Sequence, residues 1–252
     1  MITDILKNKI MNDGTELLSL VIEAHGGIER WNQLKEADIH VQIGGFTWIY
    51  KGQPDLLNDI HYRAQLHHQY GNYYPFVSQD NLSVFETGRV AIETKGGELI
   101  EELLHPRASF AAHTRESKWS KLQLVYFASY AMWNYLTFPF NFTLPGFMLQ
   151  EVEPWTENGE SWRRLEVTFP DYLETHSKKQ TFYYGEDGLL RRHDYNAVVL
   201  GGVPAAHYVY NHKDFSGIMI PTKRRVYSRK EDNSFSAEPV FITIDILDVK
   251  LK

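Results

Sequence analysis

The fold is decided by the stretch Lys178–His212, KKQTFYYGEDGLLRRHDYNAVVLGGVPAAHYVYNH, which predicts three β-strands joined by two turns. The sequence GEDG at Gly185–Gly188 is a strong signal for a tight hairpin turn. A turn centred on Glu186–Asp187 fixes which residues of the first two strands lie opposite each other. The predicted pairs are Tyr184 with Leu189, Phe182 with Arg191, and Gln180 with His193.

The second turn lies near Gly201–Pro204, and its length decides which side chains share a face of the sheet. A loop of two or four residues places odd positions before the turn on the same face as even positions after it, whereas a three-residue loop breaks this relation. The first face then carries His176, Lys178, Gln180, Phe182, Tyr184, Leu189, Arg191, His193, Tyr195, Tyr208, Tyr210 and His212. The second face carries Lys179, Thr181, Tyr183, Leu190, Arg192, Asp194, Asn196, His207, Val209 and Asn211. Because the first face is richer in aromatic residues, we expect it to point inward.

The aromatic face is the predicted ligand-binding wall. Aromatic rings with polar tips suit a pocket, because they bury a large apolar area and still offer hydrogen bonds. Together with an apolar helix described below, this face predicts the ligand-binding residues Tyr130, Trp133, His176, His193, Tyr195, Tyr208, Tyr210 and His212. The alternative is a well-packed sheet whose tyrosine hydroxyls lie at its rim.

Acid–base chemistry is the second possibility, and its candidates lie mostly on the second face. Arg192, Asp194 and His207 are predicted to lie close together there, with His193 as a further candidate. Asp194 beside Arg192 would stay ionised, and a histidine close to an aspartate can act as a general base. The alternative is a surface charge pair next to a histidine whose hydrogen bonds are satisfied.

The rest of the chain extends the strand pattern around two helical regions. Thr15–Asp38 predicts a helix that Gly26–Gly27 break into two pieces, and Leu99–Leu104 also predicts a helix. Alternating hydrophobicity predicts further strands at Ile39–Ile43, Phe46–Tyr50, His61–Tyr70, Asn81–Phe85, Arg89–Thr94, Trp162–Thr168, Pro221–Arg229 and Val240–Leu251.

The most apolar stretch, Trp119–Phe140, predicts a helix over Lys118–Phe138. Lys121, Gln123 and Asn134 interrupt it, and it contains few aliphatic side chains, so a membrane span is disfavoured. Apolar residues nearly encircle this helix, which therefore needs cover on more than one side. We expect it to lie over the concave face of the sheet.

Composition excludes several classes of protein. With 43% hydrophobic and 14% aromatic residues, the chain is not disordered, and its net charge of -6 disfavours a nucleic-acid partner. The absence of cysteine excludes disulfides, thiolate nucleophiles and cysteine-based zinc sites. The first residues, MITDILKNKIMNDG, lack the apolar core of a secretory signal, so we expect a cytoplasmic location.

Motifs for metal, nucleophilic and nucleotide chemistry are missing from the sequence. No HExxH helix occurs, and His67 and His68 would point to opposite faces of a strand, so we predict no metal site. The chain has no GxSxG, GxGxxG or Walker motif, and we predict no cofactor. The basic run Lys223–Arg225 alternates in direction on a strand, as expected of a solvated edge.

Four stretches resemble a known family. They are Ala24–Trp31, AHGGIERW; Gly188–Tyr195, GLLRRHDY; Asp214–Tyr227, DFSGIMIPTKRRVY; and Val240–Leu251, VFITIDILDVKL. In these stretches and in the order of its elements, the chain resembles the lipoprotein carriers with the LolA/LolB-like half-barrel fold. The resemblance implies an N-terminal helix, a strongly curved antiparallel sheet, and helices that plug the open side over an apolar cavity. It implies no catalytic residue.

These observations predict one domain, residues 1–252, of mainly antiparallel β-strands with helices (α+β). Its core is a curved half-barrel sheet with an N-terminal helix and a central apolar helix over the concave face. The predicted function is the binding of a hydrophobic small molecule or lipid by a soluble protein without a membrane span. The alternative is an enzyme, cyclase- or isomerase-like, that acts on an apolar substrate in the same cavity.

The cavity wall discriminates between these functions. Several buried, hydrogen-bonded ionisable groups that converge on one point would favour the enzyme. A wall of rings and aliphatic side chains would favour the binding protein, and a purely structural interaction module would have no cavity.

Overall fold

The computed structural model describes residues 13–252, and its fourteen strands belong to one antiparallel sheet. The first six strands are β1 (Glu36–Gly44), β2 (Ile60–Gln65), β3 (Tyr70–Tyr74), β4 (Asn81–Glu86), β5 (Arg89–Thr94) and β6 (Leu99–Leu104). The others are β7 (Met148–Glu157), β8 (Glu160–Thr168), β9 (Lys179–Tyr184), β10 (Leu190–Ala197), β11 (Val203–Phe215), β12 (Ile218–Arg229), β13 (Phe235–Ser236) and β14 (Ile242–Leu251).

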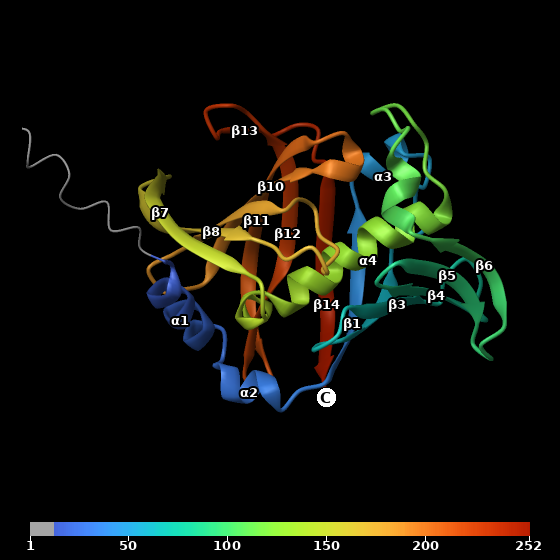
Figure 1. The fold of residues 1–252 in the computed structure, drawn as a ribbon, viewed down its shortest axis with the longest axis horizontal. Helices are drawn as coiled ribbons and strands as arrows, with labels where there is room; N and C mark the ends of the chain where they lie inside the picture. Colours follow the sequence, from blue (N-terminus) through green and yellow to red (C-terminus); the bar gives the residue numbers. More distant parts are fainter. Residues whose placement is uncertain (1–12) are drawn as a thin grey trace, which may run out of the picture.

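The strand order shows two halves joined at the centre by the last strand. From one edge to the other the order is β6-β5-β4-β3-β2-β1-β14-β12-β11-β10-β9-β8-β7, with β13 paired to β12 beside this path (Figure 1). β14 pairs with β1 from Ala37–Leu251 to Gly44–Thr243 and with β12 on its other side. The prediction of a curved, half-barrel antiparallel sheet that largely follows the sequence is confirmed.

The N-terminal helical region is broken where the glycine pair predicts it. α1 (Thr15–Ala24) and α2 (Ile28–Asn32) are separated by Gly26 and Gly27, whose φ angles are 118° and 80°. A Cβ atom on Gly26 would lie 2.0 Å from the carbonyl oxygen of Gly217 in the β11–β12 turn. Glycine is therefore required where the chain turns between α1 and α2 in close contact with the β11–β12 turn.

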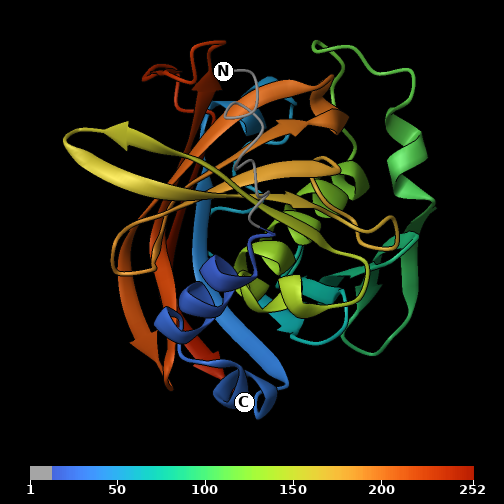
Figure 2. The ribbon, with the colours of Figure 1, turned by 60° about the vertical axis from the view of Figure 1, so that its left-hand side comes forward.

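The central helix α4 (Lys121–Thr137) lies inside the concave face, as predicted. Ser120 caps it: the Gln123 amide donates to Ser120 Oγ (3.1 Å), and the Ser120 amide donates to Gln123 Oε1 (3.0 Å). Every residue of α4 after Lys121 is buried, and Figure 2 shows the sheet curving round the helix. Among residues 13–252, no helix is long and apolar enough to cross a membrane.

The position of α4 in the chain ties the two edges of the sheet together. It follows β6, which forms one edge, and precedes β7, which forms the other. Short 3-10 helices flank it, η1 (Pro106–Phe110) and η2 (Phe140–Thr143). The helix itself lies over β3, β4 and β5, and at its C-terminal end Phe138 packs on Phe182 of β9 and His193 of β10.

Hydrogen bonds from aromatic side chains dock α4 on β2 and β3. Tyr62 Oη donates to the carbonyl oxygen of Ser129 (3.0 Å), and Tyr73 Oη donates to that of Ala128 (3.1 Å). Trp133 Nε1 donates to the carbonyl oxygens of Gln65 and His68, at 2.8 and 2.9 Å. Each buried polar tip has a partner, and the helix is fixed in register with the sheet.

Two predictions of secondary structure are wrong. Phe46–Tyr50 forms the short helix α3, not a strand, because Gly45, with φ of 113°, turns the chain at the end of β1. Leu99–Leu104 is strand β6, not a helix, because the turn at Gly96–Gly97 folds it back on β5. A pattern of five or six residues is too short for its hydrophobic period alone to distinguish a helix from a strand. The predicted strand His61–Tyr70 is also divided, into β2 and β3, and the helical region predicted to reach Asp38 ends at Asn32, with β1 beginning at Glu36.

Removing the indole that anchors α4 tests this packing. Trp133→Ala leaves a large cavity in a fully buried site, and its free energy of unfolding should fall by about 3–5 kcal/mol. Leu247→Ala, at a half-exposed position of β14, should change it by less than about 0.5 kcal/mol. Urea unfolding of both variants measures this, and equal losses would contradict the anchoring role.

Candidate functional site

The loop between β10 and β11 decides which side chains face the interior. Ala197 pairs with Val203, so the loop spans residues 198–202 and has five residues, an odd number. His193 consequently lies opposite His207, and Arg192 lies opposite Tyr208. The predicted face assignment after this turn is wrong: Tyr208 and Tyr210 do not share the face of His193, and His207 does not join Arg192 and Asp194.

The first hairpin carries a smaller correction. The turn is one residue longer than predicted, since the Gly185 amide donates to the carbonyl oxygen of Leu189 (3.0 Å), so that Leu190, not Leu189, pairs with Tyr184 and turns into the core. A bulge between Leu190 and Arg192 then shifts the register by a second residue. Beyond the bulge, His193 pairs with Phe182. Gln180, Phe182, Tyr184, His193 and Tyr195 still share the inward face, as predicted.

Fully buried polar rings converge beneath α4, and we call this group the inner ring cluster: Tyr130, Tyr135, His176, His193, Tyr195 and His207. Tyr135 Oη lies 2.7 Å from His176 Nε2, and Tyr130 Oη lies 3.3 Å from His176 Nδ1. The rings of His176 and Tyr195 stack with centroids 3.9 Å apart. The cluster gathers four of the predicted ligand-binding residues and one further predicted catalytic residue, His207.

The histidines of this cluster are neutral at pH 7. Burial lowers the pKa of His176 to about 3 and holds the pKa of His193 and of His207 well below the usual range. Burial raises the pKa of Tyr135 to about 12. His193 Nε2 pairs with Gln180 Oε1 (2.6 Å), whereas neither ring nitrogen of His207 has a partner within residues 13–252. Proton acceptors are therefore present under α4, and one imidazole is unengaged.

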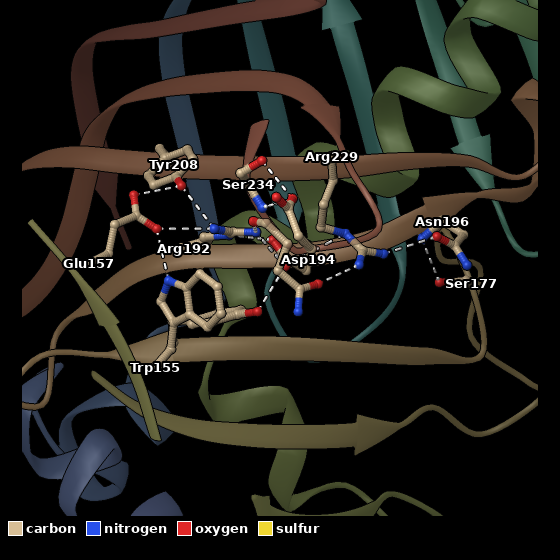
Figure 3. Close-up of polar contacts among 12 residues, drawn as sticks. Trp155, Glu157, Ser177, Arg192, Asp194, Asn196, Tyr208, Arg229 and Ser234 are labelled. Carbon is tan, nitrogen blue, oxygen red and sulfur yellow. Dashed lines mark hydrogen bonds and ion pairs between the residues drawn. The ribbon is translucent and has the colours of Figure 1, made fainter. Parts of the chain in front are cut away.

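The convex face carries the outer ion network, formed by Glu157, Arg192, Asp194, Tyr208 and Arg229 (Figure 3). Arg192 Nε and Nη2 donate to the two oxygens of Asp194 (2.7 and 2.8 Å), and Arg192 Nη1 donates to Tyr208 Oη (2.9 Å). Glu157 lies 3.2 Å from the same guanidinium. These contacts hold the β7–β8 hairpin on the sheet.

The outer ion network is saturated with partners. Asp194 also accepts a hydrogen bond from Tyr183 Oη (2.8 Å), and Arg192 Nη2 reaches the carbonyl oxygen of Asn233 (2.7 Å). A cavity of about 220 Å³ borders Asp194 and Arg229, but no histidine lines it. The carboxylate therefore has no imidazole to orient, and the predicted His–Asp pair is not formed.

Three of the remaining predicted residues lie away from the inner ring cluster. Trp133 points to the β2–β3 turn, and Tyr210 is 41% exposed. His212 packs against His25, with ring centroids 6.4 Å apart.

The sequence analysis did not predict two buried residues, Tyr135 of α4 and Arg224, which lies on the concave side of β12. The alternation of Thr222, Arg224 and Val226 was a usable signal for Arg224.

An apolar groove of about 260 Å³ opens at the surface beside α3. It is lined by Phe46, Thr47, Tyr50, Lys51, Arg115, Leu200, Val203, Pro204, Ser228 and Phe241. Behind α3 lies an interior cavity of about 10 Å³, lined by Ile43, Trp48, Phe127, Ala128, Ala131, Met132, Tyr135, Ile242 and Ile244. Trp48 of α3 thus lines the interior cavity, whereas Phe46, Thr47 and Tyr50 of the same helix line the groove.

A second interior cavity of about 10 Å³ lies on the other side of Tyr135. It is lined by His25, Tyr135, Phe138, Pro139, Tyr184, Leu190, Pro221 and Arg224. Each interior cavity has room for about one water molecule. Within residues 13–252, no group of three or more histidine, aspartate or glutamate side chains is arranged to hold a metal ion.

Comparison with known proteins identifies the class of fold. No protein-family model matches the chain, and no curated protein sequence matches it significantly. Solved structures do match. A DUF1329 family protein from Desulfovibrio piger has 14% identity and a TM-score of 0.53, with 95% of this chain and 93% of that chain covered. A putative outer membrane lipoprotein-sorting protein domain from Vibrio parahaemolyticus has 7% identity and a TM-score of 0.52, with 94% and 91% covered.

A LolA superfamily protein from Nitrosomonas europaea matches over 89% of this chain and 91% of that chain, at 12% identity and a TM-score of 0.48. At such identities, the two matches above a TM-score of 0.5 show a shared fold. The chain therefore shares the fold of these two proteins, in agreement with the half-barrel that the sequence resemblance implies.

The buried histidines predict a loss of stability in acid. His25 and His176 have folded-state pKa values of about 4 and about 3, below the unfolded value, so the unfolded chain binds more protons as the pH falls below 6.5. Lowering the pH from 7 to 5 should cost about 2 kcal/mol per buried histidine. Urea unfolding at several pH values measures this. His176→Phe should flatten the dependence and exposed His68→Gln should not; a flat wild-type profile would contradict the prediction.

Breaking the outer ion network should be costly as well. Asp194→Asn leaves the buried Arg192 guanidinium short of its main counterion, and the free energy of unfolding should fall by about 3–5 kcal/mol. Asp171→Asn removes an exposed ion pair with Lys178 and should leave the urea midpoint unchanged. If Asp194→Asn is as stable as Asp171→Asn, the network does not hold the β7–β8 hairpin.

Proposed function

We propose that the protein binds a hydrophobic small molecule or a lipid in the concave interior, between α4 and the sheet. The observation that carries this proposal is the alignment of the surface groove with the interior across α3. Phe46 and Tyr50 line the groove, whereas Trp48 of the same helix lines the interior cavity. Phe241 and Ile242 form a second such pair of neighbours.

The wall of this path suits an apolar ligand. Aromatic and aliphatic side chains dominate the groove and the cavity behind it, and such surfaces are typical of sites that recognise apolar molecules. One protein of similar fold is described as a lipoprotein-sorting domain, which supports the lipid class. Because the interior cavities are small, binding requires α3 or α4 to move aside.

Opening the barrier at α3 tests the proposal. Trp48→Ala joins the groove to the interior, so the neutral dye N-phenyl-1-naphthylamine should bind at least several-fold more tightly, as followed by its fluorescence. Removing this buried ring should cost about 3–5 kcal/mol of folding stability. Ile49→Ala, at the 66% exposed neighbour on α3, is the matched control and should behave as wild type. Dye affinity that is equal in all three proteins would refute an interior site.

A second candidate function, acid–base catalysis on an apolar substrate, is favoured by the inner ring cluster. Its buried, hydrogen-bonded ionisable groups converge on one region, and the unengaged imidazole of His207 is a neutral proton acceptor. The test is a mass shift or isomerisation of molecules extracted from the purified protein before and after incubation. Conversion that His207→Gln abolishes and Tyr210→Phe preserves would support catalysis. Extracts that never change would support binding alone.

A further inference from the structure

Arg224 is a buried cation that the protein does not neutralise. It lies on the concave side of β12, between Val209 of β11 and Ile244 of β14, and is 2% exposed. Arg224 Nη2 donates to the carbonyl oxygen of Tyr135 (3.1 Å), and the guanidinium carbon lies 4.7 Å from the centroid of the Tyr135 ring. Arg224 Nε and Nη1 have no hydrogen-bond partner within residues 13–252.

The other fully buried arginine shows what a neutralised site looks like. Arg192 is paired with Asp194 and Glu157 and is surrounded by further acceptors. Around Arg224 the charged and titratable groups are rings: His25, His193, His207, His212, Tyr135 and Tyr195. Within the described chain no carboxylate pairs with it.

This arrangement is expensive unless an anion arrives from outside. An unpaired buried charge costs several kcal/mol, and a guanidinium prefers a planar carboxylate that accepts two hydrogen bonds. Burial lowers the pKa of Arg224 to about 10, so the side chain still carries its charge at pH 7. The two unpartnered nitrogens, Nε and Nη1, are the donors left for such a ligand.

Two separate small cavities lie along the way from this cation to the groove beside α3. Arg224 and Tyr135 line one interior cavity, Tyr135 and Trp48 line the next, and the groove beside α3 follows. Arg224 is the charged group at the inner end of this path, and the cavity between Tyr135 and Trp48 is lined by apolar and aromatic side chains; most of the groove is apolar too, although Lys51 and Arg115 also line it. A ligand of matching polarity has a charged head and an apolar tail.

We propose that the interior site takes an amphiphile with a carboxylate head, which Arg224 binds while the chain runs past Tyr135 and Trp48 to the groove. This inference rests on the proposed binding function and adds the chemistry of the head group and the orientation of the ligand. Tyr135 and α4 move to admit the chain, because the cavities on either side of Tyr135 are each about 10 Å³.

The test compares laurate with 1-dodecanol, each below its solubility or micelle limit, by displacement of N-phenyl-1-naphthylamine at pH 7.5. Wild-type protein should bind laurate at least about tenfold more tightly than the alcohol, since a charge-assisted hydrogen-bonded pair contributes at that scale. Arg224→Gln should remove this preference by weakening laurate and leaving dodecanol unchanged. Arg225→Gln is the matched control: this neighbour pairs with Asp245 on the opposite face, and the preference should persist.

The outcomes separate this inference from the proposed function. If dodecanol binds as tightly as laurate, or if Arg224→Gln keeps the preference, the carboxylate assignment is wrong while the apolar site stands. If acetate displaces the dye as effectively as laurate does, Arg224 binds only a small anion, and the proposal of an amphiphilic ligand is wrong. If the dye, laurate and dodecanol all fail to bind, the proposed function itself is wrong.

Folding of the variant gives a further measurement. Because Arg224 has no counterion in the protein, ligand-free Arg224→Gln should melt at or above the wild-type temperature. A large fall in melting temperature would mean that the guanidinium is needed for packing, which contradicts a site kept for a ligand. The wild-type ranking of laurate, dodecanol and dodecyltrimethylammonium decides the charge preference even if the variant does not fold.

Discussion

The pairing of β14 with β1 is the contact on which the rest of the structure depends. It joins the first strand to the last at the middle of the sheet, so that the strands run outward in sequence order from β1 on one side and in reverse order from β14 on the other. Without it, the two halves would each expose a long unpaired central strand. The same pairing sets the curvature that encloses α4, because the twist of thirteen successive strands accumulates around one axis.

The parity of strand positions divides β10 into two chemically different faces. The outward side holds Arg192 and Asp194 in a closed ion network, and the inward side holds neutral imidazoles and phenols. Local charge balance is therefore complete outside and incomplete inside, where Arg224 is the one buried arginine of the described chain without a carboxylate. Because side chains alternate along a strand, neighbouring residues of β10 belong to the outer ion network on one face and to the proposed binding site on the other.

Prediction from the sequence succeeded where local signals were strong. It failed where one additional loop residue moved the following side chains to the other face of the sheet. The GEDG sequence and the capped, almost wholly apolar α4 contain their own evidence: the hairpin forms at GEDG, although with a shifted register, and α4 is found as predicted. The five-residue loop at 198–202 has no such signature, because the η3 turn at Val198–Leu200 adds an unforeseen residue, and it moved Tyr208 and His207 to opposite faces. Arg224 escaped notice because its neighbours Lys223 and Arg225 made it resemble part of a solvated basic run.

The chain passes from edge strand β6 through α4 to edge strand β7, and this route has a mechanical consequence. The helix lies on the concave face, and the segments that precede and follow it connect its two ends to the opposite edge strands β6 and β7. It cannot swing away on a single hinge, because both of its ends are held. A molecule that enters between α4 and the sheet must therefore reduce the curvature of the sheet or extend the connecting segments at 105–120 and 138–147. A larger molecule would thus increase the distance between the two edges of the sheet.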